Sequence, residues 1–163
     1  METEKIIGLL EERKLKELKE KLENMHPVDI VDLLEEPEVE KKQIVLLFRL
    51  LAKEEAADVF TDLNSDMREY LINALTDSEL EEVMDEMYLD DAVDVLEEMP
   101  ANVVDRLLSA TDEDTRRKIN VLLQYPEDSA GSIMNVEYIS LRKEMTVEDA
   151  ILKIRQVGIN RET

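Results

Sequence analysis

The sequence of 163 residues contains no cysteine and no tryptophan, and only one histidine and three glycines. Without cysteine there is no disulfide framework, no cysteine zinc site and no thiol nucleophile, which fits a reducing compartment such as the cytosol. The single histidine, His26, precedes Pro27 at a predicted helix start, a place where histidine more often caps or packs than catalyses. Three scattered glycines exclude a glycine-rich phosphate loop. These absences argue against an enzyme.

Long apolar runs are also missing. The longest one, Ile44 to Phe48, is far shorter than the roughly 20 residues that a membrane span requires. The first 14 residues, METEKIIGLLEERK, lack the basic start, apolar centre and small-residue cleavage site of a signal peptide. We therefore expect no direct membrane insertion by this chain.

Basic residues are scarce in the middle of the chain. No lysine or arginine occurs between Glu69 and Asp105, although this stretch holds 13 acidic residues. The net charge is −21, and residues 26–134 alone carry nine basic and 29 acidic residues. Nucleic acid and anionic lipid are therefore excluded as expected partners, because phosphate binding depends on basic clusters. A segment that repels itself this strongly is destabilised unless cations screen it or bind it.

The hydrophobic residues of the chain are mainly aliphatic, and their spacing is typical of helices. Hydrophobic residues make up 44% of the chain and aromatic residues 4%, a mixture that favours helices over a β-sandwich. Three acid-rich stretches resemble one another, HPVDIVDLLEE from His26, AKEEAADVFTDL from Ala52 and YLDDAVDVLEEM from Tyr88, and each is followed by a more apolar helical stretch. Helix pairs of about 25 residues in series predict an all-α superhelical array over residues 1–124. An irregular helical bundle is the alternative.

The character of the sequence changes after Leu123. Residues 125–135 contain Pro126 and Gly131 and are predicted to form a connecting segment without regular structure. VEYISL, from Val136, alternates like a short strand, and MTVEDAILKIRQVG has the cap and the spacing of a helix. A strand followed by a helix over 136–163 predicts the incomplete start of an α/β domain.

The stretch LDDAVDVLEEM, from Leu89 to Met99, has the spacing of a cation site. On a helix, Asp90 and Asp94 lie one turn apart on one face, and like charges at this spacing disfavour the helix by roughly 0.2–0.5 kcal/mol per pair. Oxygen ligands without cysteine predict a hard cation, Mg²⁺ or Ca²⁺. The stretch lacks the central glycine of an EF-hand loop. Since two carboxylates alone bind weakly, we expect an ion shared with another element or domain.

The run YPEDSAGSIM, from Tyr125 to Met134, resembles the MgtE family of magnesium transporters, and the resemblance extends to the acidic helical stretches. It implies an N domain built as a superhelix of short helices, over 1–124, and the start of a first CBS domain over 136–163. Matching the family motif places metal ligands at Asp90, Asp94, the backbone oxygen of Ser132 and, on an earlier repeat, Asp58.

The resemblance implies a role as well. The chain is then a cytosolic Mg²⁺-sensing regulatory domain, with Mg²⁺ as its regulatory ligand, and it gates a transmembrane pore that lies in another part of the protein. The implied partners are the CBS domains and connecting helix of the same full-length protein, which is expected to be a homodimer. From the residues alone, an acidic helical-repeat scaffold for protein–protein interaction stays open. A hydrolase with paired carboxylates is a third, weaker interpretation, because the chain has no tryptophan to form an aromatic sugar platform.

Overall fold

The computed structural model describes residues 2–126, 129–132 and 134–157. Glu127, Asp128 and Ile133 of the Tyr125–Met134 run, and the last six residues of the predicted 136–163 unit, lie outside these described residues. Within them the chain forms eleven helices: α1 (Glu2–Glu11), α2 (Leu15–Leu22), α3 (Pro27–Glu35), α4 (Lys41–Phe48), α5 (Lys53–Asp62), α6 (Ser65–Ala74), α7 (Asp77–Glu86), α8 (Leu89–Glu97), α9 (Ala101–Ala110), α10 (Glu113–Leu122) and α11 (Val147–Val157).

The helices follow a strict period. From α4 to α10 a new helix begins every 12 residues, at positions 41, 53, 65, 77, 89, 101 and 113. Several of the preceding residues are caps that accept backbone N–H groups, as Asn64, Thr76 and Asp112 do. The structural repeat is therefore a pair of helices every 24 residues. The stretch from Tyr88 is one helix out of phase with those from His26 and Ala52, because acid-rich residues occur on both members of a pair.

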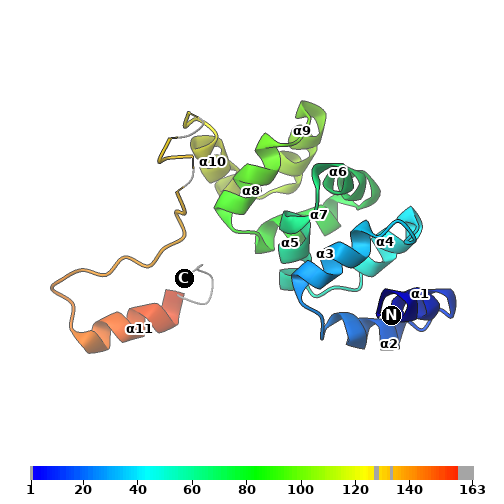
Figure 1. Cartoon of the computed structure of the whole chain (residues 1–163). Coiled ribbons are helices and arrows are strands. Elements are labelled where there is room, and N and C mark those ends of the chain that lie inside the picture. The colour runs from blue at the N-terminus through cyan, green and yellow to red at the C-terminus, as the bar shows by residue number, and fades with distance from the viewer. Residues whose placement is uncertain (1, 127–128, 133, 158–163) are drawn as a thin grey trace.

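Successive pairs stack to bury one apolar core. Helices α3, α5, α7 and α9 contact one another in series, and α8 packs against α10. Figure 1 shows the chain passing from α1 and α2 at one end of the stack to α9 and α10 at the other. The core is mainly aliphatic, and its two phenylalanines, Phe48 and Phe60, meet edge to face with ring centroids 6.2 Å apart. The prediction of an all-helical array is thus confirmed for the described residues.

The segment after α10 differs from the prediction. Its helix is confirmed as α11, but the strand predicted from Val136 is wrong, since no described residue is in a strand. A strand needs a hydrogen-bonded neighbour, and this segment runs without one toward α11. Figure 1 shows α11 lying apart from the helical stack. The apolar side chains Ile151, Leu152 and Ile154 on α11 are accordingly exposed. None of the described helices has the length and apolar character needed to span a membrane.

Candidate metal centre

Helix α8 carries the acidic residues singled out by the sequence. Its apolar side chains Leu89, Ala92, Val93, Val95 and Leu96 are buried, and this burial fixes the rotation of the helix about its axis. Asp90 and Asp91 lie in the first turn, where the partial positive charge of the helix N-terminus favours carboxylates. Asp94 follows one turn later and is exposed.

The surroundings of the Asp94 carboxylate disfavour its charged form. Partial burial raises the pKa of Asp94, and the neighbouring charges of Asp90 and Glu98 raise it further. The Oδ1 atom of Asp90 is buried and has no hydrogen-bond partner. A buried carboxylate oxygen without a partner is costly, because it has lost water and gained nothing in exchange. Both observations fit a cation on this face of α8.

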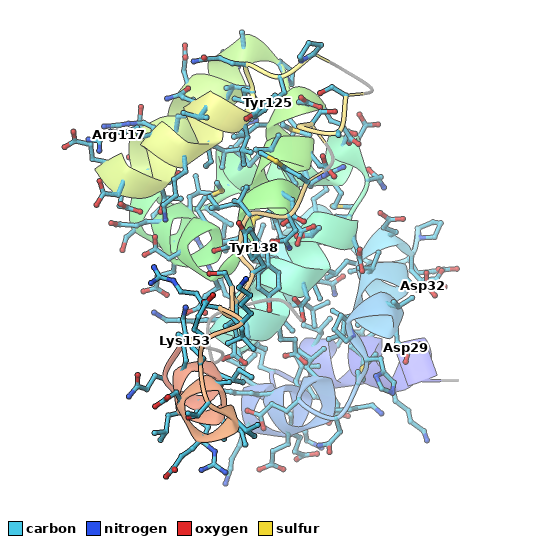
Figure 2. All side chains as sticks on the ribbon, turned by 90° about the vertical axis from the view of Figure 1, so that its left-hand side faces the viewer. Asp29, Asp32, Arg117, Tyr125, Tyr138 and Lys153 are labelled. Atoms are coloured by element: carbon cyan, nitrogen blue, oxygen red, sulfur yellow. The ribbon has the colours of Figure 1, made fainter. Side chains whose placement is uncertain are left out.

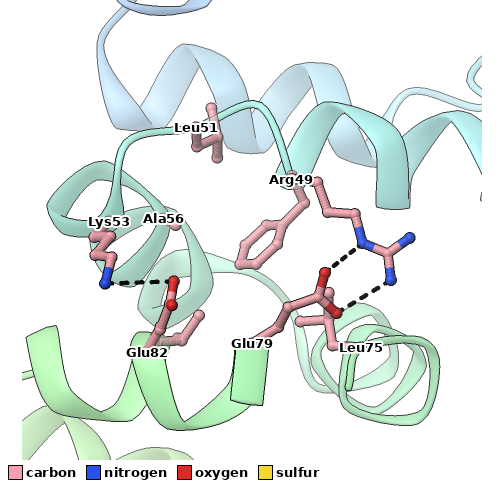
Figure 3. Close-up of a pocket in the computed structure, with 9 residues that line it drawn as sticks. Arg49, Leu51, Lys53, Ala56, Leu75, Glu79 and Glu82 are labelled. Carbon is pink, nitrogen blue, oxygen red and sulfur yellow. Dashed lines mark hydrogen bonds and ion pairs between the residues drawn. The ribbon is translucent and has the colours of Figure 1, made fainter. Parts of the chain in front are cut away.

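Among the described residues, four other acids of the base-free stretch 69–105 form ion pairs with bases from outside it. Arg49 pairs with Glu79, with Nε and Oε1 2.7 Å apart, and Lys53 pairs with Glu82 at 3.5 Å. Figure 3 shows these two ion pairs beside a cavity of about 390 Å³ between α4, α5 and α7.

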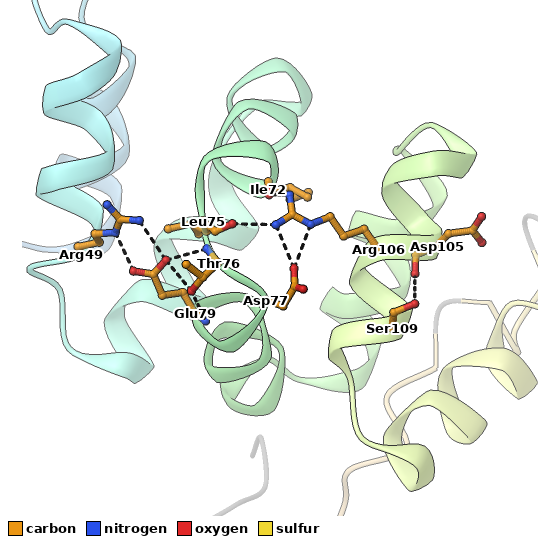
Figure 4. A network of polar contacts seen from close by, with 9 residues as sticks. All are labelled: Arg49, Ile72, Leu75, Thr76, Asp77, Glu79, Asp105, Arg106 and Ser109. Atoms are coloured by element: carbon orange, nitrogen blue, oxygen red, sulfur yellow. Dashed lines mark hydrogen bonds and ion pairs between the residues drawn. The ribbon is translucent and has the colours of Figure 1, made fainter.

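Two more bases, which flank the stretch directly, complete this arrangement. Arg68 pairs with Glu98, and Arg106 pairs with Asp77 at 3.1 Å, as Figure 4 shows for the second pair. Within the described part of the chain, neither Asp90 nor Asp94 has an ion pair with a base. Asp90 and Asp94 are therefore among the acids of this stretch whose charge no described base balances. Glu98 is already held by Arg68 and by the hydroxyl of Ser65, so it is a poor candidate ligand.

Asp58, the predicted ligand from an earlier repeat, lies on α5. Burial and the charges of Asp62 and Glu54 raise its pKa. It lines an open acidic groove of about 620 Å³ whose lining residues are His26, Pro27, Val28, Asp29, Asp58, Thr61, Asp62 and Asp91. The structure thus brings Asp58 together with Asp91, whereas Asp90 and Asp94 are not among the described residues that line this groove. The carboxylates of α8 are therefore divided between two faces of the helix, with Asp91 on the side of the groove and Asp90 and Asp94 away from it.

Ser132 lies in a tight turn of the connecting segment. Its amide and hydroxyl both donate to the carbonyl oxygen of Ser129, at 3.2 and 2.9 Å. The adjacent Gly131 packs so close to Tyr125 that a Cβ atom there would lie 2.2 Å from the tyrosine ring. Tyr125 is labelled in Figure 2. The Tyr-Pro and Ala-Gly portions of the motif therefore serve one compact turn, which fixes the backbone at Ser132.

A residue that sequence reasoning missed joins this segment to α8. The amide of Leu89, the first residue of α8, donates to Glu137 Oε2 at 2.9 Å. Met134 and Val136 pack beside it against the apolar core. No sequence signal identifies Glu137, because the contact spans 48 residues and depends on how the segment crosses α8 and α10.

The described residues supply only part of a coordination shell. They contain no group of three or more histidine, cysteine, aspartate or glutamate side chains that could hold a metal ion. The available donors on α8 are carboxylate oxygens, which suit Mg²⁺ because it retains several waters and takes one or two carboxylates from a protein. Asp90 and Asp94 thus fit a hydrated Mg²⁺ ion, and the arrangement offers no activated nucleophile.

These features define an acidic, all-helical repeat domain that carries two carboxylates without a base partner among the described residues, Asp90 and Asp94, one turn apart on α8. Residues 25–128 match the family described as MgtE intracellular N domain, and the chain belongs to this family. The chain is 35% identical over 158 residues to the magnesium transporter MgtE of Thermus thermophilus. It is 25% identical over 151 residues to the magnesium transporter MgtE of Bacillus subtilis. These alignments cover 94% and 93% of the chain but only 34% and 33% of the relatives.

Two solved structures share the fold. The crystal structure of the cytosolic domain of the Mg²⁺ channel MgtE in complex with ATP superimposes with a TM-score of 0.88 and 31% identity, over 99% of this chain and 65% of that one. The crystal structure of the soluble part of a magnesium transporter gives a TM-score of 0.84 and 24% identity, over 99% of this chain and 63% of that one. The chain spans about a third of the length of each of the two magnesium transporters.

Proposed function

We propose that this chain is a regulatory domain of a magnesium transporter that senses cytosolic Mg²⁺ through Asp90 and Asp94 on α8. One observation supports this most directly. The buried Oδ1 atom of Asp90 has no protein partner, and Asp94 is held one turn away with a raised pKa. A divalent ion relieves both costs at once, because it supplies a partner for Asp90 and cancels the repulsion between the two carboxylates.

The remaining ligands of the proposal lie elsewhere in the protein. The backbone oxygen of Ser132 is offered by a turn that hydrogen bonds hold in place. Asp58 lines the neighbouring acidic groove and contributes there either a metal ligand or a negative charge that attracts the cation. Further oxygens come from a domain that closes over α8, because Mg²⁺ prefers an octahedral shell that two carboxylates do not fill.

We assign the helical array, residues 1–124, to the N domain and residues 125–135 to the connecting segment. Residues 136–163 then begin a CBS domain. The exposed apolar side chains of α11 support this, since Ile151 and Leu152 are 44% and 48% exposed and suit coverage by the rest of such a domain. The partners are the CBS domains and the connecting helix of the full-length protein, which forms a homodimer with this domain on the cytoplasmic side of the membrane.

The regulation follows from charge. The acidic face of α8 and other acidic surfaces repel one another until divalent ions bridge them, so Mg²⁺ favours the closed arrangement to which it binds more tightly. Closure at high Mg²⁺ shuts the pore, and loss of Mg²⁺ releases it. The domain is not an enzyme in this proposal, and Mg²⁺ is its regulatory ligand.

A titration of the chain with Mg²⁺, followed by amide NMR shifts, tests the proposal. We expect selective changes around Asp90 and Asp94 at millimolar Mg²⁺, abolished by Asp90→Asn and by Asp94→Asn. The matched control is Asp105→Asn on α9, which removes one exposed carboxylate of the same acidic stretch. Na⁺ at equal ionic strength should not reproduce the changes, whereas a complex with a basic protein would be weakened by either salt. Absence of a selective response to Mg²⁺ at α8 would count against the proposal.

A further inference from the structure

The N-terminus of α8 is capped by a residue from outside the helical array. The 12-residue period places Tyr88 at its cap position, and this side chain makes no capping hydrogen bond. The helices α6, α7 and α10 are capped by their own preceding residues, Asn64, Thr76 and Asp112. In α8 the Leu89 amide donates instead to Glu137, which belongs to the segment that follows the helical array. A carboxylate at this end of a helix is favoured by the helix dipole.

The position of Glu137 is fixed from several sides. Its own amide donates to Asn135 Oδ1 at 2.6 Å. A cavity of about 390 Å³ is lined by Met134, Val136 and Glu137 of this segment, by Leu89 of α8, and by Arg117, Lys118, Val121 and Leu122 of α10. The next residue, Tyr138, labelled in Figure 2, is 68% exposed, and from there the chain runs toward α11. Glu137 is therefore a contact between the acidic helix and the chain leading to α11.

We infer that Glu137 is a positioning residue, which couples docking of segment 134–137 to cation binding on α8. The inference rests on the proposed function. The Glu137 carboxylate binds the residue directly before Asp90, so docking adds a third carboxylate to a helix start that already carries Asp90 and Asp91, with the bases Arg117 and Lys118 lining the same cavity as Glu137. A cation on Asp90 lowers the repulsion among these three carboxylates and so favours docking, and the docked Glu137 in turn raises cation affinity. Such coupling is reciprocal.

Three variants of the full chain separate docking from charge. Glu137→Gln removes the charge, and Glu137→Asp keeps the charge but shortens the side chain. Glu144→Gln is the matched control, because it removes one charge from the same part of the chain, where Glu144 is exposed and lies 3.9 Å from Lys143. We expect Glu137→Gln to shift the Leu89 amide resonance and to raise the Mg²⁺ midpoint, read from the Asp94 amide, by about fivefold. The Mg²⁺ midpoint of Glu137→Asp should lie between those of the unmodified chain and Glu137→Gln, and the midpoint of Glu144→Gln should equal that of the unmodified chain.

Docking itself can be measured without reference to Mg²⁺ affinity. The chain has no cysteine, so Tyr138→Cys accepts a single nitroxide label at an exposed position. Paramagnetic broadening of the α8 amides then reports how closely the segment lies against the helix. We expect Mg²⁺ to increase this broadening in the labelled chain and to have little effect when Glu137→Gln is added.

The possible failures are distinct. If the unmodified chain responds to Mg²⁺ but Glu137→Gln and Glu144→Gln give the same midpoint, the inference is overturned and the proposed function stands. The inference is likewise overturned if Glu137→Gln releases the segment without changing the midpoint. If the unmodified chain shows no response at Asp90 and Asp94, the proposed function fails and the coupling fails with it.

Discussion

Arg49, at the end of α4, and Glu79, in the first turn of α7, form a two-pronged ion pair across 30 residues of sequence. The Arg49 Nε and Nη2 atoms donate to Glu79 Oε1 and Oε2 at 2.7 and 3.1 Å. Arg68 with Glu98 and Arg106 with Asp77 repeat this kind of pairing between other helices of the stack, over 30 and 29 residues. The stack is therefore cross-linked by bases that also offset part of the negative charge in the middle of the chain.

The Arg49–Glu79 pair predicts a defined pH dependence of stability. The Arg49 guanidinium, helped by the Thr76 backbone, lowers the pKa of Glu79 from 4.5 to about 2. Since the folded-state pKa is depressed, the stabilisation is complete above pH 4.5 and is lost as the pH falls toward 2. Glu79 is partly exposed, so Glu79→Gln should lower the free energy of unfolding at pH 7 by only about 1 kcal/mol.

Urea unfolding at neutral pH and at a pH close to the folded-state pKa of about 2 measures this effect. The difference between the unmodified chain and Glu79→Gln should shrink markedly at the lower pH. Glu81→Gln on the same helix is the control, because Glu81 is exposed and lies outside the pair. A deficit in Glu79→Gln that is independent of pH would contradict the assigned cause.

Asp94 predicts a pH dependence of stability that is opposite in sign to that of Glu79. Its pKa is raised by burial and by Asp90 and Glu98, so its charge opposes folding above the folded-state pKa, and this penalty vanishes as the pH falls below the unfolded value of 3.8. Asp94→Asn should therefore raise the free energy of unfolding at pH 7 by about 0.5 kcal/mol in metal-free buffer. Thermal unfolding with and without Mg²⁺ checks this. Saturating Mg²⁺ should remove the advantage of the variant, whereas Asp105→Asn should show no such reversal.

Besides its ion pair with Asp77, Arg106 forms hydrogen bonds with the C-terminal end of α6. Its guanidinium donates to the carbonyl oxygens of Ile72 and Leu75, the second at 2.8 Å. Arg106→Ala leaves these acceptors without their charged donor and should cost about 2 kcal/mol of unfolding free energy. Arg106→Lys should restore less than half, since one ammonium group cannot reach all three acceptors. Arg117→Ala, which removes two exposed ion pairs within α10, should cost less than about 0.5 kcal/mol in the same assay.

Gly131 predicts a steric effect in the connecting turn. A Cβ atom there would meet the Tyr125 ring at 2.2–2.6 Å, so Gly131→Ala should displace the ring and cost about 1 kcal/mol. Ring proton shifts of Tyr125 and thermal unfolding report the two effects, and a double-mutant cycle with Tyr125→Ala should recover part of the cost. Gly8→Ala is the control, because a Cβ atom at Gly8 in α1 meets nothing within 4 Å and should stabilise the helix.

Much of the fold could be predicted from local patterns. Aliphatic spacing, caps such as Asp112 and the acid-rich repeats indicate short helices in series, and those helices form. The phase of the repeat could not be predicted from the Tyr88 stretch, because both helices of a pair are amphipathic and acidic. The strand from Val136 was wrong for a different reason, since alternation indicates a face that can be buried but does not supply a neighbouring strand.

The candidate site was predictable in part. Helical spacing places Asp90 and Asp94 one turn apart, and their mutual repulsion in the structure agrees with this. The ligand roles of Asp90, Asp94, Ser132 and Asp58 remain predictions. The pairing of Glu98 with Arg68 and the cap from Glu137 could not be predicted from the sequence, because each partner lies 30 or more residues away.

By itself the sequence determined the helical class of this protein, its acidic middle and the alignment of Asp90 with Asp94, because these depend on composition and on neighbours within one or two turns. The tertiary structure alone decided which acids are paired with bases. Bases from outside residues 69–105 reach Glu79, Glu82, Glu98 and Asp77 only when the helices stack, and in the described part of the chain no such base reaches Asp90 or Asp94 on α8. Stacking also brings Glu137 to the start of that helix, since packing places side by side groups that the chain keeps far apart.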